Sequence, residues 1–188
     1  MKTYYWFNRN RFLSHLRTNF CALAMLGALL ALPSSEAVEP RSRPQHTAGT
    51  PVSASGQFFP CFNYAGPPRQ VGENLIVTFN ISGTATGTLT GSSVGTELDV
   101  VHPDGSITLH GTILFTTSDN SGTMLLTYEG IGNAVTGHET LRFVGRQGTG
   151  VLAGAYANLT AEGDVGAPEP GCDLSGVGTY TGFLIFAP

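Results

Sequence analysis

The sequence has little positive charge, and the part that reads as a folded domain has almost none. Lys2 is followed by no other lysine, and residues 71–188 contain two arginines, Arg142 and Arg146, against eleven acids. A nucleic-acid-binding protein needs clustered cations to displace counterions from phosphates, and an anionic membrane surface attracts basic segments. The composition therefore argues against nucleic acid and against membrane surfaces as partners.

The short motifs that specify common reactions are also missing. The sequence has no Gly-x-Ser-x-Gly elbow, no phosphate-binding loop and no histidine metal box. We therefore expect no metal and no cofactor, and the common hydrolase and nucleotide-binding classes are disfavoured.

Residues 1–37 have the features of a cleavable signal peptide. A basic leading region is followed by an uncharged apolar run from Cys21 to Leu32, and small residues stand at Ser35 and Ala37. A membrane-spanning helix needs ~20 apolar residues, so the run is short for the alternative, an uncleaved anchor. The pattern predicts cleavage after Ala37, export to a secreted or extracytoplasmic location, and no stable membrane anchor afterwards.

Two cysteines, Cys61 and Cys172, remain after that cleavage. In an oxidising compartment a single pair indicates a disulfide, with two free buried thiols as the alternative. The pair would close a loop of roughly a hundred residues, worth about 4–5 kcal/mol in the chain-entropy description.

Residues 38–57 are rich in Pro, Ser, Thr and Ala without periodicity, which predicts a disordered leader. Residues 58–70 instead gather aromatic side chains around Cys61, and such side chains are costly to leave in water. We expect this segment to pack on a domain formed by residues 71–188, either as a tethered segment or as a first strand.

From residue 71 onward the pattern is that of β-structure. Leu75, Val77 and Phe79 alternate with polar residues, as do Leu109 and Phe115 on a later segment. Period-two alternation predicts strands with one buried face. The expected strands lie near 73–82, 84–101, 106–117, 122–130, 136–145, 149–163 and 177–186. Seven strands, or eight with residues 58–64, predict an all-β, antiparallel up-and-down barrel, with a β-sandwich as the alternative.

Three glycine-rich segments, 83–91, 148–156 and 178–182, carry a family resemblance. They are similar to the allene oxide cyclase-like barrel superfamily, and closer to its small families of unknown function than to the cyclases or the dirigent proteins. Over about residues 71–188, the resemblance implies a small antiparallel barrel of about eight strands with an apolar interior. It transfers no catalytic residue.

Glu139 is the best candidate for chemistry inside such a barrel. It shares strand parity with Leu141 and Phe143, so an inward-facing strand would bury its carboxyl and raise its pKa. The alternative is an exposed position at the start of the strand. Tyr128 and Tyr180 are further candidates to line the interior, although buried tyrosines with a satisfied hydroxyl are the commoner case.

The other polar positions are interpreted as surface. Glu97 and Asp99 share a face opposite Leu98, which predicts an exposed acidic strand face rather than an acid–base pair or part of a calcium site. His110, His138 and Arg142 also fall on polar faces. Asn80 and Asn158 begin glycosylation acceptor patterns, which matter only in a host that glycosylates exported proteins.

The sequence thus predicts an exported barrel whose reaction, ligand and oligomeric state it does not specify. The leading hypothesis is a non-enzymatic module that binds a small apolar ligand or presents its surface to a partner. The alternative is a cyclase or isomerase acting on a lipid-like or phenolic substrate by confinement. A ligand-sized cavity containing Glu139 or a tyrosine would favour either of these over a packed interior.

Overall fold

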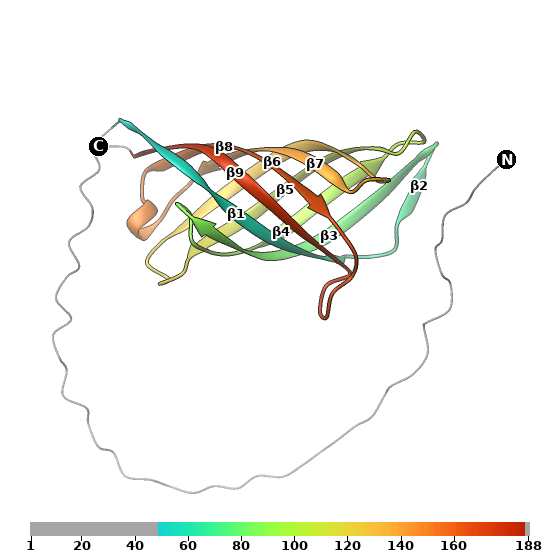
Figure 1. The fold of residues 1–188 in the computed structure, drawn as a ribbon, viewed down its shortest axis with the longest axis horizontal. Helices are drawn as coiled ribbons and strands as arrows, with labels where there is room; N and C mark the ends of the chain where they lie inside the picture. Colours follow the sequence, from blue (N-terminus) through green and yellow to red (C-terminus); the bar gives the residue numbers. More distant parts are fainter. Residues whose placement is uncertain (1–48, 187–188) are drawn as a thin grey trace, which may run out of the picture. The chain divides into compact units, whose positions relative to one another are not determined.

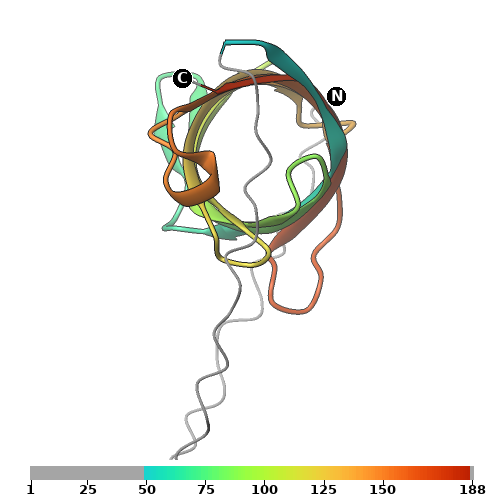
Figure 2. The same ribbon diagram turned by 90° about the vertical axis from the view of Figure 1, so that its left-hand side faces the viewer.

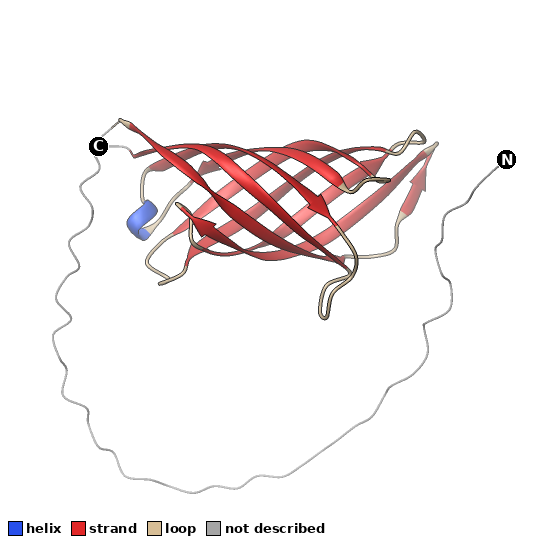
Figure 3. Cartoon of the chain, in the orientation of Figure 1, coloured by secondary structure: helices blue, strands red, loops and turns tan. Residues whose placement is uncertain are grey.

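The computed structural model describes residues 49–186, and the alternation in the sequence becomes β-strands almost throughout this part. The strands are β1 (Pro51–Tyr64), β2 (Arg69–Val71), β3 (Asn74–Gly87), β4 (Gly91–Val101), β5 (Ser106–Thr117), β6 (Thr123–Asn133), β7 (His138–Arg146), β8 (Ala155–Val165) and β9 (Leu174–Phe186). Within these residues, one 3₁₀ turn, η1 (Gly150–Leu152), is the only helical element (Figure 3). No helix among them is long and apolar enough to cross a membrane.

The strands close into an antiparallel barrel. Each strand from β3 to β9 pairs with its neighbours along the chain, and β1 closes the ring by pairing with both β9 and β3. The strands cross the barrel obliquely in Figure 1, and Figure 2, which looks along the barrel, shows a closed ring. Eight strands form this ring, and the short β2 pairs with the start of β3 beyond the end of β1. The predicted barrel is confirmed, and the β-sandwich alternative is wrong.

Several predicted boundaries need correction. β1 begins at Pro51, so residues 51–57 belong to the barrel and not to the leader predicted over 38–57. Residues 58–64 lie in β1, so the alternative of a strand over these residues is confirmed, and the alternative of a segment packed on the barrel is wrong. The strand expected over 84–101 is two strands, because the chain turns at residues 88–90. The predicted signal peptide, with the leader up to residue 48, lies outside the described residues.

Inward-facing side chains form the hydrophobic core of the barrel. The alternation expected for β3 and β5 is confirmed: Val77, Phe79 and Leu109 are buried, while the intervening Thr78 and Thr108 are exposed. Closing eight twisted strands leaves an interior just wide enough for side chains or one small ligand. What occupies the middle of the barrel is therefore decided by the size of the inward residues.

Glycines on the inner face make room for large rings from the next strand. Gly111 pairs with Tyr128, and a side chain at position 111 would collide with the tyrosine ring. Gly56 stands in the same relation to Tyr180. The two rings therefore lie against neighbouring backbone, which is a known way for aromatic residues to cover strand glycines.

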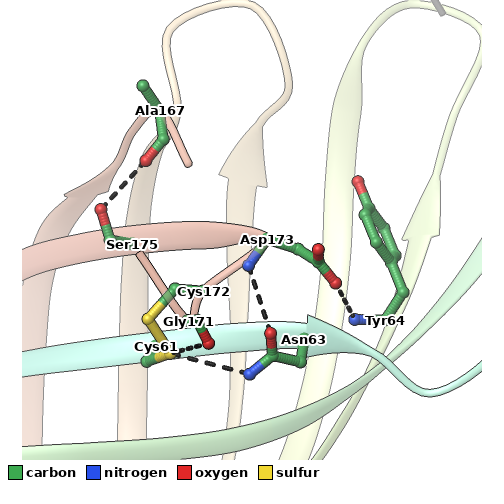
Figure 4. Close-up of a disulfide and its surroundings, with 8 residues drawn as sticks. All are labelled: Cys61, Asn63, Tyr64, Ala167, Gly171, Cys172, Asp173 and Ser175. Carbon is green, nitrogen blue, oxygen red and sulfur yellow. Dashed lines mark hydrogen bonds between the residues drawn. A yellow bond between two sulfur atoms is a disulfide. The ribbon is translucent and has the colours of Figure 1, made fainter. Parts of the chain in front are cut away.

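A disulfide joins Cys61 of β1 to Cys172, which precedes β9, as predicted (Figure 4). The same junction is supported by hydrogen bonds. The backbone N–H of Tyr64 donates to Asp173 over 2.9 Å, and the backbone N–H of Asp173 donates to the side-chain oxygen of Asn63 over 3.3 Å. Together these contacts fix the 166–173 loop to the end of β1.

Candidate functional site

The interior of the barrel contains a cavity of about 100 Å³. Most of the side chains around it are aliphatic or aromatic and come from opposite sides of the ring, among them Phe62, Ile81, Leu126 and Leu159. One end is covered by the turn between β3 and β4, whose Leu89 is buried and also lines the cavity (Figure 2). A concave, mainly apolar space with a few polar groups is typical of a small-molecule site.

The backbone pairing of β1 with β9 is interrupted beside the cavity. The paired residues run from Phe58↔Gly178 to Cys61↔Ser175, with no pairing between the residues in between. Pro60, which has no N–H to donate, lies at this interruption. Val177 lies there as well; it lines the cavity and is 51% exposed. The two strands keep the same register on both sides of this interruption, so the ring stays closed here.

Three carboxyl groups project into the interior. Glu97 and Asp99 of β4 are 4% and 6% exposed, and Glu139 of β7 is 9% exposed. Glu97 and Glu139 line the cavity together with Tyr128 of β6. Burying a carboxyl is expensive unless the group is neutral or well paired, so three in one small barrel is an unusual feature that calls for an explanation.

Tyr128 and Glu97 form the central polar contact. The Tyr128 hydroxyl donates to Glu97 Oε2 over 2.7 Å, and the ring stacks at a tilt on Phe143 with centroids 4.8 Å apart. Burial, followed by the nearby Glu97 carboxyl, raises the pKa of Tyr128, so this hydroxyl keeps its proton. Burial also raises the pKa of Glu97, while the bond from Tyr128 opposes that rise.

The other two acids favour their neutral forms. Burial raises the pKa of Glu139 to about 8, and the Glu97 carboxyl contributes in the same direction. Burial, the Glu97 and Glu139 charges and a contact with Glu97 raise the pKa of Asp99 to about 9. Asp99 Oδ1 is buried without a hydrogen-bond partner among the described residues. The interior thus holds acids with protons to donate near neutral pH.

Tyr180 has a different role from Tyr128, although both rings line the cavity. Its hydroxyl accepts a hydrogen bond of 2.8 Å from the backbone N–H of Leu89 and donates to the carbonyl of Thr86 over 3.1 Å. Both partners belong to the end of β3 and the turn after it. The Tyr180 hydroxyl therefore anchors the turn that covers one end of the barrel.

The structure brings together three of the residues singled out in the sequence: Glu139, Tyr128 and Tyr180 line one cavity. The interpretation of Glu97 and Asp99 as an exposed acidic face is wrong. Apolar residues on the opposite parity of β4, such as Leu98, made that parity look like the core face. The Asp104-Gly105 hairpin could have predicted the buried face of β4. A short turn there pairs Asp99 with Leu109, and directly paired residues lie on the same face of the sheet.

The remaining candidates lie on the outer face. His110, His138 and Arg142 are exposed, and His138 Nδ1 lies 3.0 Å from Asp164 Oδ1. Asn80 is exposed and Asn158 is half-buried. Within residues 49–186, no three His, Cys, Asp or Glu side chains are placed to hold a metal ion.

Comparisons with known proteins support the fold and leave the chemistry open. No protein-family model matches the sequence, and no curated protein matches it significantly. Among solved structures, the chain is similar to a protein of unknown function from the DUF3224 family of Shewanella oneidensis MR-1. The TM-score is 0.55 at 18% sequence identity, over 74% of this chain and 99% of that chain. The chain therefore has the barrel fold of a solved protein whose function is also unknown.

Proposed function

We propose that the protein is an exported binding module that holds a small, largely apolar ligand inside its barrel. The main observation in support is the cavity itself. Its walls are mainly apolar, and Glu97, Tyr128 and Glu139 place polar groups in it. A purely structural interior would gain stability from filling that space and would have no use for buried acids.

Two features support export and membership of a wider superfamily. The disulfide between Cys61 and Cys172 favours an oxidising, extracytoplasmic location, in agreement with the expected signal peptide. If that location is correct, sequencing of the exported protein will begin at or near Val38, and a secreted form that retains Met1 would contradict it. The closed eight-stranded ring and the glycine-rich segments support placement among allene oxide cyclase-like barrels.

The test is native mass spectrometry of protein purified from its own secretion. We expect a retained small molecule that is absent from Ala161→Leu, because Ala161 is buried and lines the cavity, and a larger side chain would fill it. The matched control is Ala134→Leu at an exposed position, which will retain the molecule. A secreted protein that carries no ligand, and that binds none of a panel of small apolar compounds, would contradict the proposal.

A second candidate function is a cyclase or isomerase acting on a lipid-like or phenolic substrate. The observation that favours it is the pKa of about 8 at Glu139, which suits a general acid or base working near neutral pH. Such an enzyme would lose turnover in Glu139→Gln while still binding its substrate. A ligand recovered chemically unchanged after incubation would leave the binding module as the function.

A further inference from the structure

The cavity contains buried acids that no cation of residues 49–186 neutralises. Of the described residues that line it, none is Lys, Arg or His, whereas Glu97, Glu139 and Asp164 are lining residues. Asp164 is exposed and lies beside His138, so the buried acids of the lining are Glu97 and Glu139. The cations of the described part, Arg69, Arg142 and Arg146, have no part in the lining. Buried charges in proteins are normally paired or bound to ions, so a set of acids without a cation is incomplete by itself.

Of the two buried acids that line the interior, Glu139 is the one without a hydrogen bond from the described residues. Glu97 accepts the Tyr128 hydrogen bond, but the Glu139 carboxyl makes none with the described residues, although the side chain is 91% buried (9% exposed). Its cross-strand neighbours, Gly132 of β6 and Gly163 of β8, bring no side chain toward it. The carboxyl therefore faces the cavity with its hydrogen-bonding capacity free.

The titratable groups that act on Glu139 are acids and a phenol. Glu97 and Asp99 reach it from β4, and Tyr128 comes from β6. On β8, Asp164 has its carboxylate 3.0 Å from His138, and both side chains are exposed. Every group that faces Glu139 from inside the barrel is thus neutral or negative, and a positive charge placed there would be attracted by all of the ionised ones.

We propose that the ligand is an organic ammonium ion with a short apolar chain, whose ammonium group lies between Glu97 and Glu139 while its chain packs among the apolar side chains of the cavity. This inference rests on the proposed binding function and names its ligand class. The ammonium would donate to both carboxylates, which satisfies Glu139 and compensates the negative charge.

The geometry favours an organic cation over a bare metal ion. A metal ion would need several oxygen ligands converging on one point, and the described acids are not placed to supply them. An alkylammonium ion can donate hydrogen bonds to two separate carboxyl groups without a converging ligand set, and its apolar body matches the walls. The cavity of about 100 Å³ is smaller than the ~150 Å³ of a cavity that binds benzene, so a chain of roughly four carbons is a suitable probe.

The test compares three probes of equal length, butylamine, butan-1-ol and sodium butyrate, by isothermal titration calorimetry at pH 7. We expect butylamine to bind at least about tenfold more tightly than butan-1-ol, and butyrate to bind worst. Binding the cation ionises the acids beside it, so titrations in buffers of different ionisation enthalpy will show proton release. Glu139→Gln will lose at least about tenfold in butylamine affinity and keep its affinity for butan-1-ol.

Two further variants complete the experiment. Glu97→Gln tests the second acceptor, and we expect it to weaken butylamine binding to the same degree as Glu139→Gln. The matched control is Glu129→Gln, at an exposed position of β6, which will bind butylamine like the parent protein. Equal or tighter binding of butan-1-ol would overturn the cationic ligand while leaving the binding function intact. Failure of all three probes to bind would overturn both.

Discussion

Replacing Glu139 with glutamine should stabilise the protein at neutral and alkaline pH and leave it unchanged in acid. Burial raises the pKa of this carboxyl from its ordinary 4.5 to about 8. A raised pKa means that the folded state holds the proton more tightly than the unfolded state. The stability that this proton provides is complete below about pH 4.5 and is lost as the pH rises towards about 8. Glutamine fills the same space without a proton to lose.

The magnitude follows from the size of the shift. Each pH unit between the two pKa values changes the free energy of unfolding by about 1.4 kcal/mol. At pH 7 the folded carboxyl is still mostly protonated, so the wild-type protein gives up about 3 kcal/mol relative to its stability in acid, and about 4–5 kcal/mol above pH 8. For a domain of this size, 3 kcal/mol corresponds to roughly 10 °C in the thermal midpoint.

The assay is chemical denaturation of the two proteins at pH 4 and at pH 8, with Glu129→Gln as the exposed control. The Glu139→Gln protein should match the wild type at pH 4 and exceed it by several kcal/mol at pH 8, while the control stays within ~0.5 kcal/mol at both. A difference between wild type and Glu139→Gln that is small and independent of pH would refute the reasoning, since it would mean that the carboxylate is solvated in the folded barrel.

Three more predictions follow from the packing and the cross-link. Tyr180→Phe removes both hydrogen bonds to the β3–β4 turn, so we expect a loss of about 1–3 kcal/mol in stability and faster amide hydrogen exchange at that turn; unchanged exchange would contradict this. Gly111→Ala places a methyl group against the Tyr128 ring and should lower the free energy of unfolding by about 1–3 kcal/mol in urea titrations, whereas an unaltered midpoint would show that the ring moves freely. Serine at Cys61 or Cys172 should cost about 2–5 kcal/mol and loosen the 166–173 loop first, and quantitative alkylation of the native protein without reductant would show that the bridge is absent.

The wrong prediction for Glu97 and Asp99 of β4 shows that the alternation of polar and apolar residues within one strand does not always identify the buried face. On β3 and β5 the apolar residues form one unbroken set, and the buried face followed from it. On β4 the inward positions are Ser93, Gly95, Glu97 and Asp99, while aliphatic residues point outward, so local hydrophobicity gave the wrong face. Cross-strand pairing overrides local composition, because every residue on an inner face must lie beside inner residues of both neighbouring strands.

The sequence by itself determined the class of this protein: strands from period-two alternation, turns from Asp-Gly and related pairs, and a disulfide from a single cysteine pair. The alternation and the turn pairs depend only on neighbouring residues, and the disulfide prediction depends only on the number of cysteines, so all three can be predicted without a structure. Only the tertiary structure decided that β1 begins at Pro51 and closes the ring, that three acids share one interior, and that a cavity remains between them. Closure joins strands from opposite ends of the chain, and a cavity is the space left after all eight strands have packed. Both depend on contacts between residues far apart in the sequence, and no local pattern records them.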